Sequence, residues 1–140
     1  MRAAIRFMCF TLALLVLSVA TVACAATFTF SNGLDLRMSV TLTYFDRDLD
    51  ALTTRGWWHV EPGGETVITV NADELRGVYY AAFNRVPFID SSTRGNPQIV
   101  RWASPRTFAY TTDEEPFDYG AWQAHFYRID GQIVHIDARR

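Results

Sequence analysis

Hydrophobic and polar residues alternate along most of the chain, which is the pattern of β-strands with one buried and one wet face. Between Arg37 and Tyr44 every second residue is apolar, and Ser or Thr fills the positions between them from Ser39 onward. Further strand-like runs cover residues 27–31 and 78–83. The pattern predicts an all-β domain built from antiparallel sheets.

A Pro-Gly pair marks a turn between two more strand-like runs, at residues 55–60 and 65–70. Pro62 has the fixed φ of the second turn position, and Gly63 tolerates the positive φ of the third, as a type II turn requires. We therefore expect strands 55–60 and 65–70 to pair antiparallel as a hairpin.

An Asp-Gly pair at residues 130–131 separates the runs 121–129 and 132–136. Asp-Gly is typical of a type I′ turn, in which both central residues have positive φ, so we expect a second hairpin here. In its register His125 and His135 point to opposite faces of the sheet, and this hairpin cannot bring them to one metal ion.

The remaining segments complete the prediction of a single domain. Residues 71–77 carry polar residues suited to a helix cap and a final Gly, so one short helical turn is expected near residues 72–76. Short strands are expected at 98–102 and 107–111, after a loop at 84–97. About seven to nine short strands with frequent turns are typical of a β-sandwich or barrel.

Residues 1–25 have the pattern of a secretory signal peptide, because Arg2 and Arg6 precede an apolar run that ends in small residues. Residues 26–140 would then form one exported domain, in the periplasm or outside the cell. A retained membrane anchor is an alternative, since about 20 apolar residues span a bilayer. Lipidation at Cys24 is another. All three interpretations place the domain outside the cytoplasm.

Composition narrows the classes of function. Both cysteines, Cys9 and Cys24, lie in the leader, so the exported domain is expected to be held by its core rather than by disulfides. Without Arg2 and Arg6, 11 of the 13 basic residues remain against 15 acidic ones. This balance argues against a nucleic-acid partner, whose binders carry basic patches. A membrane partner is expected only if the leader is retained.

The run from Thr54 to Gly63, with two adjacent tryptophans before a Pro-Gly turn, resembles a motif of the bacterial domain of unknown function 1036 family. The resemblance continues in a Tyr-rich strand that ends in Ala at residues 79–82, and in a closing strand at 126–130. It spans roughly residues 28–130 and implies a short exported protein, but no reaction. The family often has a cysteine just after the turn, where this chain has Gly64 and Glu65.

The two adjacent tryptophans are the most prominent candidate for function. Successive residues of a strand point to opposite faces, so Trp58 is expected to share the buried face of Val60, and Trp57 the face of His59. One interpretation is that both indoles pack in the core, since aromatic side chains bury large areas. The other is an exposed aromatic platform for a sugar, a lipid or a peptide.

The platform hypothesis gives a set of candidate binding residues, with Trp102 and Trp122 as extensions of the surface. The set is Trp57, Trp58, His59, Tyr79 and Tyr80.

Metal sites find little support in the sequence. Residues 46–50 have the alternating acids of a calcium loop, but an EF-hand needs Gly and Glu where this chain has Ala51 and Trp57. A solvated hairpin tip is the favoured interpretation, and a calcium site of another kind remains open. A transition metal needs three or four converging ligands, so we predict neither a metal nor another cofactor.

Motifs for catalysis are also missing. The exported part has no Cys nucleophile and no Gly-x-Ser-x-Gly elbow, and neither common phosphate-binding loop occurs. Acids such as Asp90, Asp113 and Glu114 could still meet in space as an acid–base pair.

The sequence therefore predicts a non-catalytic envelope or secreted domain that binds a glycan, a lipid or a protein through its aromatic residues. We assign no catalytic residue. A small exported hydrolase that uses carboxylates or a histidine such as His59 is the alternative.

Overall fold

The computed structural model describes residues 25–84, 99–111 and 120–137. Within these residues it has nine strands and one short 3-10 turn, which confirms the predicted all-β class. The elements are β1 (Ala26–Asn32), β2 (Met38–Asp46), β3 (Ala51–Val60), β4 (Glu65–Val70), η1 (Glu74–Arg76), β5 (Val78–Phe83), β6 (Ile99–Ala103), β7 (Phe108–Thr111), β8 (Trp122–Arg128) and β9 (Ile133–Ile136).

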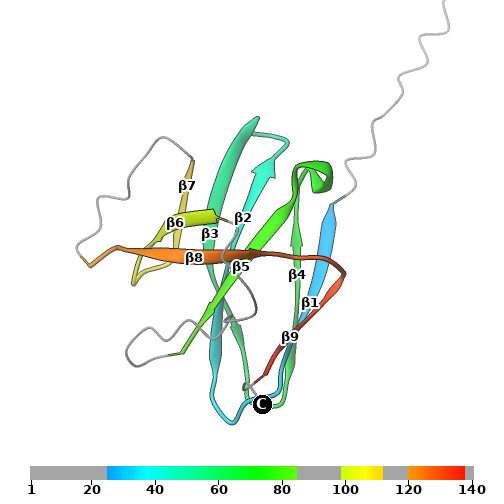
Figure 1. Cartoon of the computed structure of the whole chain (residues 1–140), viewed down its shortest axis with the longest axis vertical. Helices are drawn as coiled ribbons and strands as arrows, with labels where there is room; N and C mark the ends of the chain where they lie inside the picture. The colour runs from blue at the N-terminus through cyan, green and yellow to red at the C-terminus, as the bar shows by residue number, and fades with distance from the viewer. Residues whose placement is uncertain (1–24, 85–98, 112–119, 138–140) are drawn as a thin grey trace, which may run out of the picture.

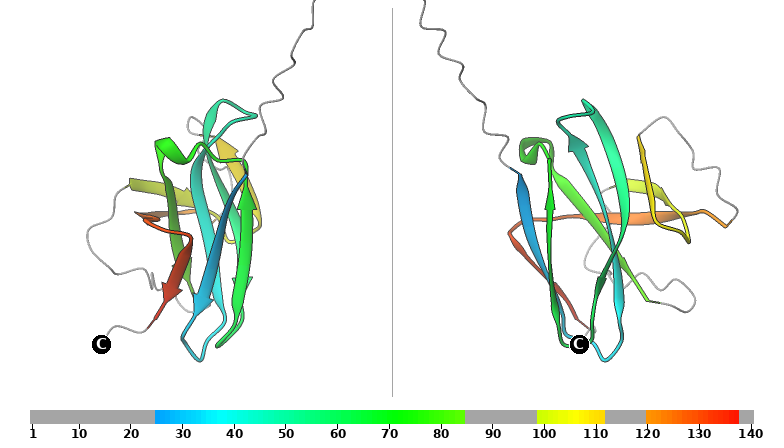
Figure 2. Two further views of the ribbon diagram at one scale, coloured as in Figure 1. Left: turned by 90° about the vertical axis from the view of Figure 1, so that its right-hand side faces the viewer. Right: turned by 180° about the vertical axis from the view of Figure 1, so that it is seen from behind.

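These strands form two sheets (Figures 1 and 2). The smaller sheet has the order β4-β1-β9 and the larger has the order β6-β8-β5-β2-β3-β7. The pairs are antiparallel except that β9 lies parallel to β1. β9 therefore runs in the same direction as its neighbour β1, whereas two strands joined by a hairpin run in opposite directions.

The main core lies between the two sheets, because alternation gives each central strand one apolar face. β2 shows this clearly: Met38, Val40, Leu42 and Tyr44 are fully buried. The larger buried members of this core come from both sheets and are Phe28, Phe30, Met38, Val40, Leu42, Tyr44, Val60, Ile68, Val70, Val78, Tyr80, Val134 and Ile136.

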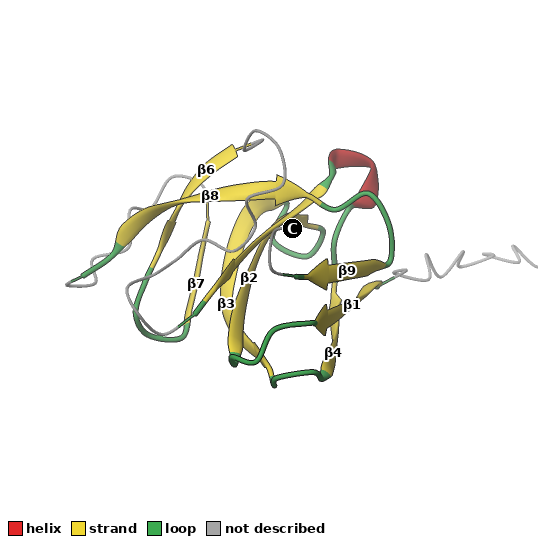
Figure 3. Ribbon diagram, turned by 60° about the horizontal axis from the view of Figure 1, so that its bottom comes forward, coloured by secondary structure: helices red, strands yellow, loops and turns green. Residues whose placement is uncertain are grey.

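The larger sheet curls into a half-barrel whose inner side carries a second core. Its two edge strands, β6 and β7, follow each other in the chain and lie on the same side of the molecule (Figure 3). The hydroxyl of Tyr110 on β7 donates a hydrogen bond to the carbonyl of Trp102 on β6. The buried residues of this inner core are Ala81, Phe83, Ala103, Ala124 and Phe126.

The Pro-Gly turn forms as predicted, but the hairpin does not. Gly63 has φ of +63° and Gly64 N donates to the carbonyl of Glu61 at 2.9 Å, as in a type II turn. However, β3 belongs to the larger sheet and β4 pairs with β1 in the smaller one. The reason is burial: Val60 and Ile68 both lie in the main core, and two strands reach one core from opposite sheets when the turn crosses between the layers.

The second predicted hairpin is also wrong. Gly131 is not among the described glycines with positive φ, so the type I′ turn is not adopted. Instead the chain leaves β8 and crosses to the smaller sheet, where β9 pairs with β1. Two backbone bonds hold this crossing, from Ile129 N to the carbonyl of Val78 at 2.8 Å and from Thr29 N to that of Gln132 at 2.7 Å.

The predicted helical turn is present as η1, and its N-cap is Asp73. The carboxylate of Asp73 accepts a hydrogen bond from Leu75 N, and Gly77 ends the turn with φ of +87°. The acids at residues 46–50 form the tip of the β2–β3 hairpin, as favoured from the sequence. The carboxylate of Asp46 accepts hydrogen bonds from the backbone N–H groups of Asp48 and Leu49 there.

Several sequence predictions fall on segments outside the described residues. These are the leader at 1–24, most of the loop at 84–97, and the acids Asp90, Asp113 and Glu114. In the part of the chain that is described, no helix has the length and apolar character needed to cross a bilayer.

Candidate functional site

The two adjacent tryptophans lie at an irregularity in the pairing of β2 with β3. Val40 lies opposite Trp58, but the next residue, Thr41, lies opposite Gly56, so Trp57 is an extra residue in β3. This is the arrangement of a β-bulge, which redirects a side chain and increases the local twist. Here it directs Trp57 to the inner side of the half-barrel, whereas Trp58 lies against the main core.

Gly56 lies where the ring of Phe108 and the side chain of Thr41 leave too little room for a Cβ unless one of them moves. A Cβ at Gly56 would lie 2.9 Å from Cε1 of Phe108 and 3.2 Å from Oγ1 of Thr41. Phe108 on β7 lies directly opposite Gly56 on β3. In the Gly-Trp-Trp sequence, Gly56 therefore makes the close contact with Phe108, and Trp57 is the extra residue of the bulge.

Four rings on the inner side of the half-barrel form what we call the aromatic cluster: Trp57, Phe83, Phe108 and Trp122. Trp57 and Trp122 are stacked, with ring centroids 6.0 Å apart and an interplanar angle of 11°. Phe83 and Phe108 contact Trp57 edge-on, at 5.4 and 5.5 Å. Such edge-to-face and offset contacts are favourable beyond the area they bury.

The indole of Trp57 is also fixed by hydrogen bonds. Its Nε1 donates to the carbonyl of Ser104 at 2.9 Å and to that of Arg106 at 3.2 Å, both in the β6–β7 connection. Trp57 and Trp122 are nevertheless only half-buried. Each residue is therefore neither fully enclosed nor fully exposed, and the contacts described above set the orientation of its ring.

His59 lies on the same face as the aromatic cluster, as predicted for Trp57 and His59. Ser39 lies opposite His59 on one side and opposite Phe83 on the other. Ser39 Oγ and His59 Nδ1 are 3.0 Å apart in a hydrogen bond, and the His59 side chain is exposed.

The other predicted binding residues are divided between the two faces. Tyr80 is buried in the main core, 5.7 Å from Phe30 between ring centroids, and therefore cannot belong to a surface platform. Trp58 is half-buried against the same core. Tyr79 is half-buried on the inner side of the half-barrel.

No aromatic residue in the described part of the chain is fully exposed. Trp57 and Trp58 both pack against a core, as one of the two interpretations of the sequence had it, and a half-buried cluster stands in place of the exposed platform of the other. Phe83 and Phe108 were missed because their contacts with Trp57 depend on the curl of the sheet. Trp122 was named only as an extension. No short-range signal in the sequence identifies these pairs.

Two buried tyrosines, Tyr44 and Tyr110, have a pKa that their surroundings shift. Burial raises the pKa of Tyr44 and of Tyr110, against smaller opposing effects that include Arg55 beside Tyr44 and Arg101 near Tyr110. Both phenols are therefore neutral at physiological pH. They act as hydrogen-bonding core residues and not as bases.

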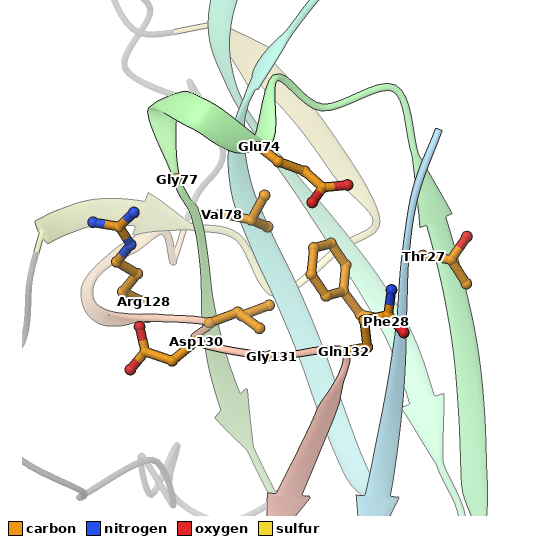
Figure 4. A pocket seen from close by; sticks show the side chains of 10 residues that line it. Thr27, Phe28, Glu74, Gly77, Val78, Arg128, Asp130, Gly131 and Gln132 are labelled. Carbon is orange, nitrogen blue, oxygen red and sulfur yellow. The ribbon is translucent and has the colours of Figure 1, made fainter. Parts of the chain in front are cut away.

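A hollow lies at one end of the main core, where η1 and the β8–β9 crossing meet β1 (Figure 4). It has a volume of about 330 Å³. Its lining residues, which include no histidine, are Thr27, Phe28, Glu74, Gly77, Val78, Arg128, Ile129, Asp130, Gly131 and Gln132.

The histidines do not converge on one another. His125 lies opposite Val100 in the larger sheet and His135 opposite Ser31 in the smaller one. His125 and His135 are separated because they belong to different sheets, and not because of the hairpin register expected from the sequence. Across the described ranges, no three His, Cys, Asp or Glu residues lie close enough together to hold a metal ion.

Comparison with known proteins gives no relative: no family model, no curated protein and no solved structure matches the chain. The resemblance to the domain of unknown function 1036 family therefore stays a prediction from the sequence.

Proposed function

We propose that this chain is an exported, non-catalytic binding domain, and that its ligand contacts the aromatic cluster. The observation that supports this most strongly is the stacked pair of Trp57 and Trp122, which is half-buried and held in one orientation. Rigid aromatic rings with part of their surface in water are well suited to binding, because little conformational entropy is lost on contact.

The chemistry around the cluster is suited to a ligand with both apolar and polar groups. The rings offer apolar faces and edges, and the exposed pair of Ser39 and His59 on the same side offers hydrogen bonds. A glycan has this combination in its ring faces and hydroxyl groups. A lipid or a protein segment of the cell envelope is the alternative ligand.

Export is part of the proposal, and it rests on the leader. Arg2, Arg6 and the apolar run after them favour secretion to the periplasm or the medium. The domain would then meet envelope glycans and lipids directly. Retention of the leader would keep the same domain on the outer side of the inner membrane.

Titration of the purified protein with envelope glycans, peptidoglycan fragments and lipid vesicles tests the binding. We expect one ligand class to quench the tryptophan fluorescence in a saturable way. Trp57→Phe and Trp122→Phe should each weaken that binding about tenfold, toward the lower end of the 1–3 kcal/mol (about 5- to 150-fold) that stacking of a nucleobase on an aromatic side chain contributes. Trp58→Phe, on the other face of β3, is the matched control and should bind normally.

Two outcomes would overturn this proposal. One is the failure of every ligand class to bind the folded protein. The other is binding that Trp58→Phe weakens as much as Trp57→Phe, because the aromatic cluster would then not be the contact surface.

A small hydrolase is the second candidate, and the hydrogen bond between Ser39 and His59 is the observation in its favour. In many nucleophilic sites a serine hydroxyl is hydrogen-bonded to a histidine, which acts as its general base. Hydrolysis of simple ester and glycoside substrates, compared between the wild type and both Ser39→Ala and His59→Ala, decides the question. Activity that both substitutions abolish, in proteins with unchanged melting temperatures, would replace the binding proposal.

A further inference from the structure

The hollow between the sheets has an apolar floor and a polar opening. Phe28 and Val78 are buried residues of the main core, and Ile129 packs against it. Figure 4 shows the Glu74 carboxylate directed over the ring of Phe28, with the amide of Gln132 below it. A ligand in this position would place its apolar part on the floor and a polar group at Glu74.

Within the described part of the chain, no basic side chain forms an ion pair with the carboxylate of Glu74 at the opening. Arg47 and Arg76 both pair with Asp73, at 4.0 and 3.6 Å, and not with Glu74. Arg76 also lies over the ring of Phe45, 3.7 Å from its centroid. Glu74, in contrast, forms no ion pair with any described residue.

The arginine that lines the hollow does not neutralise Glu74 either. Arg128 lies opposite Tyr79, and Tyr79 faces the inner side of the half-barrel and not the main core. Figure 4 shows the guanidinium of Arg128 and the carboxylate of Asp130 on the other side of β5 from Glu74. Of the charged groups that line the hollow, Glu74 is therefore the one whose charge lies over the apolar floor, and its carboxylate favours a cation there.

We propose that the hollow is a second ligand site, which binds a small organic ammonium compound with a short apolar body. The ammonium group donates to the carboxylate of Glu74 and to the amide oxygen of Gln132. The apolar body lies on Phe28, Val78 and Ile129. This site is separate from the aromatic cluster and does not depend on the function proposed for it.

The size of the hollow sets the size of the ligand. A volume of about 330 Å³ is near the lower end of the range of small-molecule sites, about 300–1,000 Å³. A liquid water occupies about 30 Å³, so a ligand of roughly five to ten non-hydrogen atoms fits. A butylammonium ion is a suitable probe because it combines one ammonium group with a four-carbon chain.

Nuclear magnetic resonance titration of the purified protein with three probes of equal length tests the site. We expect butylammonium to shift the amide resonances of Val78, Gly131 and Gln132 in a saturable way. Neutral butanol should bind several-fold more weakly, and butyrate should cause no saturable shift at these residues. The tryptophan indole resonances of the aromatic cluster should stay unchanged, which separates this site from the proposed function.

Glu74→Gln is the decisive variant, since it keeps the shape of the side chain and removes its charge. It should weaken butylammonium binding about fivefold, the effect of a partly exposed ion pair, and leave butanol binding unchanged. Glu65→Gln is the matched control, because Glu65 lies opposite Ser31 at the far end of β4, and it should bind like the wild type. Equal binding of butanol and butylammonium, unchanged binding by Glu74→Gln, or shifts confined to other residues would each overturn the proposal.

Discussion

Trp57 and Trp122 stack within 11° of parallel, although their strands, β3 and β8, are not neighbours in the sheet. The contact spans the inner side of the half-barrel and connects its two halves. Trp57 can reach it because the bulge in β3 places an extra residue at that point. The bulge thus allows the first of the two adjacent tryptophans to contact Trp122 on the other half of the curled sheet.

Truncation of either adjacent tryptophan should destabilise the protein. The sequence placed only Trp58 on the buried face of Val60, but both indoles pack against buried clusters. We expect Trp57→Ala and Trp58→Ala each to lower the free energy of unfolding by about 3 kcal/mol, the lower end of the range for Trp in a core, because both are half-buried. Chemical denaturation measures this, and a nearly neutral Trp57→Ala would contradict the packing described for the aromatic cluster.

Gly56 should not tolerate a methyl group. In Gly56→Ala the added Cβ would lie 2.9 Å from Phe108, and the ring or the strand must move. We expect a loss of about 1–3 kcal/mol in the free energy of unfolding, as for overpacking elsewhere. Gly131→Ala is the control, since its Cβ would meet nothing within 4 Å; if the two variants melt alike, the close contact at Gly56 is not tight.

The sequence predicted the strands well because alternation is a local signal. The predicted run 65–70 coincides with β4, and 78–83 with β5. The two hairpins failed for different reasons: at Gly63 the turn forms but does not determine which sheet the next strand joins, whereas at Gly131 the predicted turn is itself not adopted. Gly63 adopts its predicted conformation and still leads from one layer to the other.

The candidate site was predictable only in part. Trp57 and His59 share a face as expected, because strand alternation survives on either side of the bulge. Tyr80 was wrongly included among the binding residues. Residues 78–83 show no alternation of charged and apolar positions, so the sequence did not indicate whether Tyr79 or Tyr80 lies on the buried face. The partners Phe83 and Phe108 depend on long-range curvature, which no short window of sequence contains.

Asn32 should be among the most important polar residues for stability. Its side chain is 2% exposed, and its Nδ2 donates to the carbonyls of Leu36, Val60 and Glu61 at 2.7, 3.1 and 3.2 Å. These bonds tie the end of β1 to the end of β3, across the two sheets. Asn32→Ala leaves buried carbonyls without a donor, and we expect a loss of about 2–3 kcal/mol.

Asn71→Ala provides the comparison for that prediction. Asn71 Oδ1 is buried and has no hydrogen-bond partner among the described residues, so removing it takes away a group that they leave unsatisfied. We expect this variant to unfold within about 0.5 kcal/mol of the wild type or to be slightly more stable. Urea denaturation of both variants decides the matter, and equal losses would show that the Asn32 bonds carry no special weight.

Alkaline pH should destabilise the protein through Tyr44 and Tyr110. Burial raises the pKa of both phenols above the ordinary value of 10.0, so the folded state holds these protons more tightly than the unfolded state. The corresponding stability is fully present below pH 10 and is lost as the pH rises through the folded-state pKa values. Unfolding free energies measured between neutral pH and pH 11 should therefore fall steeply above pH 10 in the wild type and less steeply in Tyr44→Phe. A decline of equal slope in both proteins would assign the alkaline loss to groups other than Tyr44.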